Sequence, residues 1–70
     1  MLGTLVSWFN PRSYGFIRPD SPVAGLPVEI FVHISDMPNR RPLPKDTRVF
    51  FEIGTFGGRT KAIKVTEVSR

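Results

Sequence analysis

Short runs in which hydrophobic and polar residues alternate recur along the chain, and turn-forming residues separate them. Alternation with a period of two is the pattern of a β-strand that is buried on one face. It predicts five strands, at residues 2–10, 14–18, 28–34, 47–53 and 60–68. The connections between them hold most of the prolines and glycines. Residues 35–38 predict a single capped helical turn, because Ser and Asp side chains accept bonds from backbone N–H groups.

The spacing of apolar residues argues against any longer helix. No window of 11 or more residues has apolar positions at helical spacing. Five short strands without a helix favour a small closed barrel, because closure leaves no exposed edge. An RRM sheet also carries rings on its strands, but it needs two packing helices for which this chain has no room. We therefore expect an all-β fold, a small five-stranded antiparallel barrel of the OB type.

Aromatic and aliphatic residues fall on opposite faces of the second and third predicted strands. Tyr14 and Phe16 share one face of the second strand, and Phe31 shares a face of the third with His33. The opposite faces carry the residues expected to fill the core: Gly15, Ile17, Ile30, Val32 and Ile34. If the rings pointed inward, these aliphatic side chains would have to cover the outside of the barrel. We therefore expect the rings to point outward.

Rings beside cations are what single-stranded nucleic acid requires, because bases stack on aromatic faces and phosphates bind Arg or Lys. Trp8 adds ring area just upstream, whereas Phe9 is expected to pack beneath it. Ten Lys and Arg against six Asp and Glu give a net charge of +4. That charge alone would also fit a role in solubility, but several of the cations lie in turns next to the ring-bearing strands. The candidate binding residues are Trp8, Arg12, Tyr14, Phe16, Phe31, His33, Arg40, Arg41, Arg59 and Lys61.

Three segments of the chain resemble the signature of the cold-shock domain family. They are Trp8-Phe9-Asn10, Arg12-x-Tyr14-Gly15-Phe16-Ile17 and Ile30-Phe31-Val32-His33-Ile34-Ser35, and residues 49–53 and 62–65 match in order. The resemblance implies an OB-type barrel that binds single-stranded RNA or DNA and acts as a nucleic-acid chaperone. It also implies that Trp8 lies on the binding face and that Arg12 contacts a phosphate or stacks on a base.

The chain departs from the family pattern at several matched positions. Lys61 stands where a base-contacting Gln is common, which shifts the expected contact toward phosphate. Arg40-Arg41-Pro42 stands near the usual Gly-Phe, so charge replaces a stacking ring. Ser7, Ser13 and Ile34 replace the usual Lys, Gly, and Phe or Gln. These departures bear on the length of the binding footprint rather than on its existence.

Composition argues against several other classes of protein. With no cysteine and one histidine, we expect no disulfide, no metal site and no cofactor. The acidic residues are scattered, and His33 with Ser35 lacks a third orienting group, so we expect no catalysis and no small-molecule substrate. No apolar run approaches the roughly 20 residues of a membrane span, which favours a cytoplasmic domain without membrane contact. The remaining alternative is an SH3-like interaction barrel whose aromatic face binds a Pro-rich peptide.

Seventy residues permit one domain with a small core. We expect residues 1–70 to form that domain, either as a whole protein or as the N-terminal domain of a longer, membrane-anchored one. No unpaired apolar strand stands out, so a monomer is expected. Stacking does not distinguish the two sugars, and the choice between RNA and DNA stays open.

Overall fold

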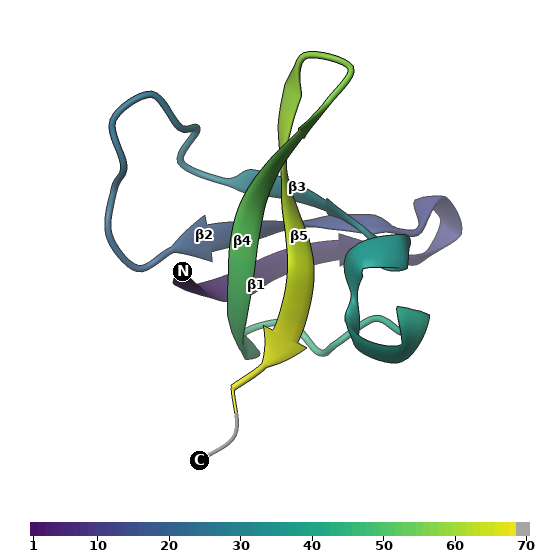
Figure 1. Ribbon diagram of the computed structural model, residues 1–70. Helices are drawn as coiled ribbons and strands as arrows, with labels where there is room; N and C mark the ends of the chain where they lie inside the picture. Colours follow the sequence, from purple (N-terminus) through teal and green to yellow (C-terminus); the bar gives the residue numbers. More distant parts are fainter. Residues whose placement is uncertain (69–70) are drawn as a thin grey trace.

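A computed structural model describes residues 1–68 of the chain. Its strands are β1 (Leu2–Phe9), β2 (Tyr14–Pro19), β3 (Ile30–His33), β4 (Arg48–Phe56) and β5 (Arg59–Glu67). Three short 3-10 turns lie in the connections: η1 (Asn10–Arg12), η2 (Ile34–Asp36) and η3 (Pro38–Arg40). Figure 1 shows β4 and β5 crossing in front of β1, β2 and β3. All five predicted strands are therefore present, with shifted ends.

The strands form one closed barrel in the order β1-β2-β3-β5-β4, with β4 pairing back onto β1. This confirms the predicted all-β barrel of the OB type. One pair is an exception to its antiparallel arrangement, because β3 and β5 run parallel. A closed ring with an odd number of strands cannot alternate direction at every step, so at least one parallel pair is required. A closed barrel of five strands therefore implies at least one such parallel pair.

Nine apolar side chains fill the barrel: Leu5, Ile17, Ile30, Val32, Met37, Val49, Phe51, Ala62 and Val65. Three of the predicted core residues, Ile17, Ile30 and Val32, are fully buried. The prediction for Ile34 is wrong, since its side chain is only partly buried. The chain leaves the sheet after His33, and Ile34 opens η2 instead of continuing the strand alternation.

The connection from β3 to β4 contains the predicted helical turn, one residue earlier than expected. Its cap also differs from the prediction, because the backbone N–H of Ser35 donates to the ring of His33 rather than to a Ser or Asp side chain. Met37 follows this turn and adds a buried side chain to the core from outside the sheet. The connection thus joins β3 to β4 and also supplies a side chain to the core.

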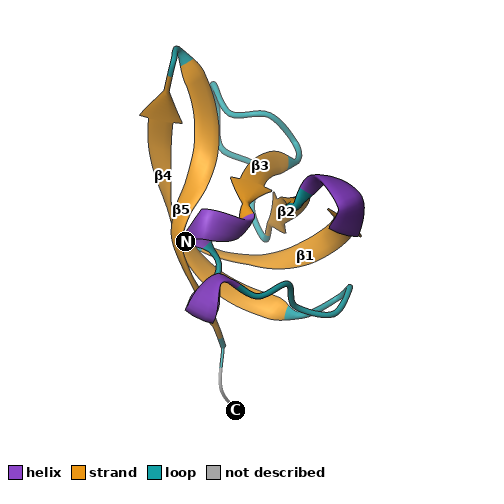
Figure 2. Ribbon diagram, turned by 90° about the vertical axis from the view of Figure 1, so that its right-hand side faces the viewer, coloured by secondary structure: helices purple, strands orange, loops and turns teal. Residues whose placement is uncertain are grey.

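The turn between β4 and β5 is shorter than the predicted turn at residues 54–59, because β4 ends later and β5 begins earlier than predicted. β4 continues to Phe56, and only Gly57 and Gly58 form the turn, with φ of 59° and 79°. Two positive φ values define a tight hairpin turn whose twist matches that of the strands, and glycine adopts them without a steric cost. Figures 1 and 2 show the tip of this hairpin extending past the rest of the barrel.

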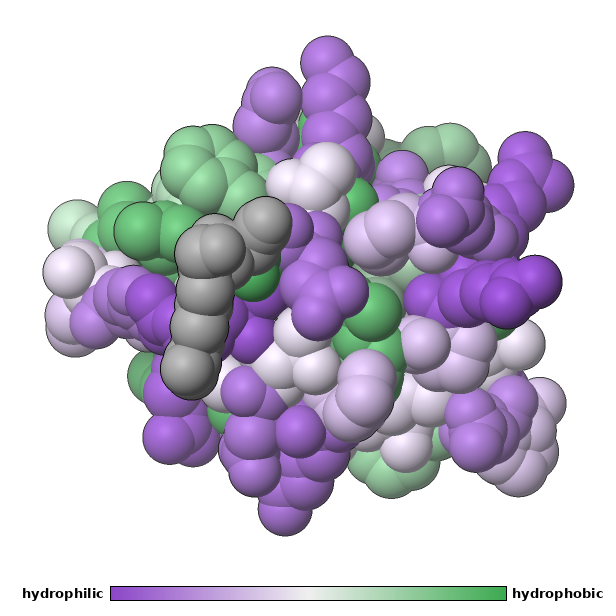
Figure 3. Space-filling model, turned by 90° about the horizontal axis from the view of Figure 1, so that it is seen from below, coloured by the Kyte–Doolittle hydropathy of each residue, from purple (hydrophilic) through white to green (hydrophobic). Residues whose placement is uncertain are grey.

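The outer surface carries both polar and apolar side chains. Figure 3, seen from below, shows hydrophilic side chains over most of that face, with hydrophobic ones in separate patches. Among residues 1–68 there is no helix with the length and apolar character needed to cross a bilayer.

Candidate nucleic-acid interface

Four rings from three adjacent strands meet on the outside of the barrel. We call them the aromatic cluster: Phe9, Tyr14, Phe16 and Phe31. The ring centroids of Tyr14 and Phe31 lie 5.4 Å apart in a stacked arrangement, and those of Phe9 and Tyr14 lie 5.1 Å apart. Phe16 meets its neighbours edge to face. The predicted outward orientation is confirmed, because none of these rings belongs to the buried core.

A β-bulge in β1 decides which of its rings joins the cluster. Before the bulge Leu5 pairs with Ile17, and both side chains are buried. The register then shifts between Leu5 and Ser7, so that Phe9 pairs with Tyr14 on the outer face. Without the extra residue, Phe9 would share the inward-facing side with Leu5. The prediction that Phe9 packs beneath Trp8 is therefore wrong: its side chain is 43% exposed.

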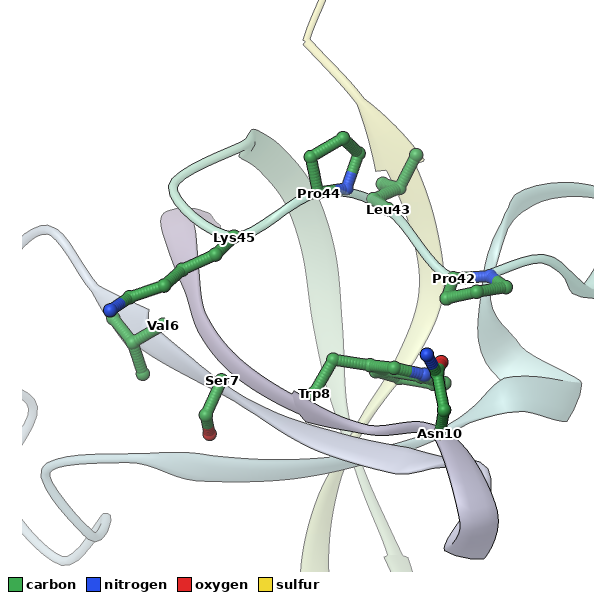
Figure 4. Close-up of a pocket in the computed structure, with 8 residues that line it drawn as sticks. All are labelled: Val6, Ser7, Trp8, Asn10, Pro42, Leu43, Pro44 and Lys45. Carbon is green, nitrogen blue, oxygen red and sulfur yellow. The ribbon is translucent and has the colours of Figure 1, made fainter.

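Trp8 takes the opposite orientation and packs partly against the core. It pairs with Gly15, where a Cβ would lie 2.6 Å from the Trp8 Cε3 atom, so glycine is needed for the indole to fit. The indole lines an open groove of about 540 Å³ between β1 and the segment at residues 42–45. Figure 4 shows it with Asn10 beneath Pro42, while Lys45 lies at the other end of the groove. Trp8 is thus accessible from this groove and is not part of the aromatic cluster.

His33 extends the outer row of rings, because it pairs with Tyr14 across β2 and β3. Its Nδ1 atom accepts a hydrogen bond of 3.1 Å from the backbone N–H of Ser35 and lies 3.0 Å from the Ser35 hydroxyl. An accepting Nδ1 leaves the hydrogen of the neutral ring on Nε2. The helical turn therefore orients the imidazole, and Nε2–H is the group left to donate to a base edge.

Phe16 and Phe31 pair across β2 and β3 and form a second row on the outer face. Lys61 continues this row, because it is in register with Phe31 across the parallel pair. Its Nζ atom lies 2.9 Å from Asp36 Oδ2, and the two side chains are only 23% and 21% exposed. That carboxylate oxygen is buried, and the ammonium compensates its charge. Sequence reasoning missed Asp36, which it treated only as a helix cap. The pair forms only because the connection from β3 brings η2 beside β5.

The four remaining predicted cations lie at three places on the surface. Arg12 belongs to η1, two residues before Tyr14. Arg40 and Arg41 stand at the end of η3, and Arg59 opens β5 at the hairpin tip. All four are exposed, and none of them forms an ion pair within residues 1–68. Arg12 lies in the turn that joins Phe9 to Tyr14, two residues of the aromatic cluster, whereas the other three cations belong to η3, its C-terminal end and the hairpin.

Two further cations are paired. Arg18 contacts Glu29 at 3.0 Å, and both guanidinium nitrogens of Arg48 donate to the carboxylate of Asp20. The hydrogen bonds from Arg48 hold the pKa of Asp20 below its ordinary value of 3.8. Charge at these positions is matched within the protein, so the unpaired cations are the ones available to a polyanion.

The strand order and the ring-bearing outer face define a small OB-type barrel whose surface suits flat, negatively charged ligands. The chain belongs to the family described as the 'cold-shock' DNA-binding domain, whose model matches residues 1–68. This family binds nucleic acids and is not a family of enzymes. The comparison with curated proteins found no match.

Proposed function

We propose that this domain binds single-stranded RNA or DNA with low sequence specificity and acts as a nucleic-acid chaperone without catalysis. The observation that carries the proposal is the aromatic cluster, four rings held on the outer face while the branched aliphatic residues fill the core. Base stacking on such rings contributes about 1–3 kcal/mol per base, so a few rings provide useful affinity.

Each predicted residue has a role in this proposal. Unpaired bases stack on the cluster, with Trp8 and His33 adding contacts at its border. The unpaired cations Arg12, Arg40, Arg41 and Arg59 neutralise phosphates, and Lys61, whose charge is already compensated by Asp36, contacts the strand beside Phe31. The polyanion contacts make affinity fall as salt rises, with a slope of about −0.7 for each phosphate neutralised on a single strand. Sequence preference is modest, because every base has a face that can stack.

Chaperone action needs no further machinery. A protein that binds unpaired strands but not duplex shifts the equilibrium toward melting by mass action. We propose that it does so as a monomer in the cytoplasm, with no membrane contact, and that the unpaired strands it releases pair again after dissociation. The SH3-like alternative has less support, because the neighbours of the rings are arginines rather than an acidic cluster that would bind a basic peptide.

The test is a titration of Trp8 fluorescence with single-stranded oligo-dT at two salt concentrations. Trp8 precedes Phe9 of the cluster in β1 and its indole lines an open groove, so a strand that runs from the cluster into this groove should quench its emission. We expect tight binding at low salt, weaker binding at high salt, and little binding to a duplex of the same length. Absence of quenching at micromolar protein would overturn the proposal.

A double variant, Tyr14→Ala with Phe31→Ala, separates this function from the peptide-binding alternative. If oligonucleotide binding survives the loss of both rings while binding to a Pro-rich peptide disappears, the surface is a protein-interaction site. The matched control is Phe50→Ala, which removes an exposed aromatic side chain from β4, outside the cluster.

A further inference from the structure

Phe56 is the most exposed ring of the barrel, at 76%. It belongs neither to the buried core nor to the aromatic cluster. It ends β4 at the tip of the hairpin and pairs there with Arg59. An exposed apolar side chain on its own is ordinary. Here, however, the ring is held next to two cations, because the Nζ atom of Lys61 also lies 5.4 Å from its centroid.

The position of Lys61 connects this ring to the aromatic cluster. Lys61 is in register with Phe31 on one side and with Gly54 on the other, and Phe56 lies two residues beyond Gly54. Strand spacing of about 4.8 Å and a rise of about 3.3 Å per residue put the backbones of Phe31 and Phe56 roughly 12 Å apart. The order along the outer face is therefore ring, cation, ring.

The ion pair between Lys61 and Asp36 limits the movement of the cation between the two rings. The hairpin tip beyond it is open, because a Cβ placed on Gly57 or on Gly58 would meet no atom within 4 Å. Lys61 lies over one face of the Phe56 ring, and the rest of the ring is open, since the residue is 76% exposed. A flat, anionic ligand can reach it from the direction of Phe31.

We propose that Phe56, with Arg59 and Lys61 beside it, is an additional base-stacking position at the hairpin tip, which lengthens the bound strand beyond Phe31. This inference rests on the proposed function and assigns one more contact to it. The occupant is a base of the same single strand, because Arg59, which pairs with Phe56 across the hairpin, is exposed and forms no ion pair within residues 1–68, so it can contact the phosphate of that base. The base stacked on Phe56 belongs to a nucleotide further along the bound strand than the nucleotide whose base stacks on Phe31.

The experiment measures affinity by Trp8 fluorescence for oligo-dT of about 4 to 12 nucleotides, within the site sizes of OB folds. We expect Phe56→Ala to match the wild type for the shortest oligonucleotides and to bind the longer ones roughly 5- to 150-fold more weakly. Phe56→Leu keeps an apolar side chain without a ring and should lose affinity as well, whereas Phe56→Tyr keeps a ring without adding a second indole to the signal and should retain affinity. The matched control, Phe50→Ala, should leave every length unchanged.

The outcomes separate this inference from the proposed function. If the wild type binds no oligonucleotide, the proposed function fails. If the wild type binds and Phe56→Ala binds equally at every length, the function stands and the additional position is refuted, as it would be if Phe56 served a protein partner. Equal losses at every length would also refute it, since they would place Phe56 inside the shortest site. Thermal unfolding should be unchanged in Phe56→Ala, because the ring buries little surface.

Discussion

Besides the hairpin tip with Phe56, two regions of the outer surface expose rings, and only one of these two has the features of a binding site. The aromatic cluster joins four rings from β1, β2 and β3. At the other end of β1, Leu2 pairs with Phe50 of β4, and these side chains are 42% and 51% exposed; we call them the Phe50 patch. Both regions are apolar, and both include a residue of β1.

Charge distinguishes the two regions. The nearest outward cation of the Phe50 patch, Arg48, is bound through two hydrogen bonds to Asp20 and through a third to Thr4. Next to the aromatic cluster, Arg12 is exposed and forms no ion pair within residues 1–68. An exposed ring is thus a weak indication of function by itself. Rings in mutual contact beside an unpaired cation are a stronger one.

The largest expected effect is on binding. Tyr14→Ala with Phe31→Ala removes the stacked pair from the cluster and should weaken oligo-dT binding by at least roughly 30-fold, because each stacked base contributes about 1–3 kcal/mol. Leu2→Ala with Phe50→Ala removes the other patch and should leave affinity unchanged. Fluorescence titration measures both, with circular dichroism to check folding. Equal losses in the two variants would erase the distinction between the regions.

Stability should depend strongly on the glycine beneath Trp8. A Cβ at Gly15 would lie 2.3 Å from the Ser7 carbonyl oxygen and 2.6 Å from the indole, so Gly15→Ala should destabilise the fold by about 1–3 kcal/mol. Denaturant unfolding measures this. Gly3→Ala, near the Phe50 patch, is crowded by the Arg18 carbonyl oxygen and should also destabilise. Only Gly15→Ala should shift the Trp8 emission of the folded protein, and an unshifted spectrum would contradict the described packing.

A smaller effect should follow from releasing Lys61. Asp36→Asn removes the carboxylate 2.9 Å from its ammonium, so Lys61 can bind phosphate. Affinity for oligo-dT at low salt should rise about 1.5- to 5-fold, and the salt slope should steepen by about 0.7.

Asp20→Asn is the control for this variant, because it raises the net charge by the same amount but releases Arg48 beside the Phe50 patch. Salt-dependent titrations of the two variants therefore separate position from total charge. If both variants steepen the slope equally, the location of the released cation does not matter.

The smallest effect is the pH dependence of the Asp20–Arg48 pair, because ion pairs on the surface contribute little. The pKa of Asp20 is lowered in the folded state by the hydrogen bonds from Arg48. Its contribution to stability is thus fully present above the ordinary value of 3.8 and is lost as the pH falls through the folded-state pKa. Melting temperatures of the wild type and Asp20→Asn should differ at neutral pH and converge in acid. A difference that grew in acid would contradict this assignment.

Much of the cluster could be predicted from local alternation. Tyr14, Phe16 and Phe31 follow the period of two that also places Ile17 and Val32 in the core. Alternation failed for Phe9 because the bulge after Leu5 changes the face, and no residue type marks that bulge. It failed for Ile34 because the strand ends one residue earlier.

The amino-acid sequence by itself determined the five strands, the outward rings and the aliphatic core, because strand geometry alternates side chains between two faces within a few residues. Only the tertiary structure decided that Phe9 replaces Trp8 in the cluster, that Asp36 neutralises Lys61 and that Phe56 stands at an open hairpin tip. These features depend on register between strands and on where the β3–β4 connection packs. Closure of the barrel fixes both, through contacts between residues far apart in the chain.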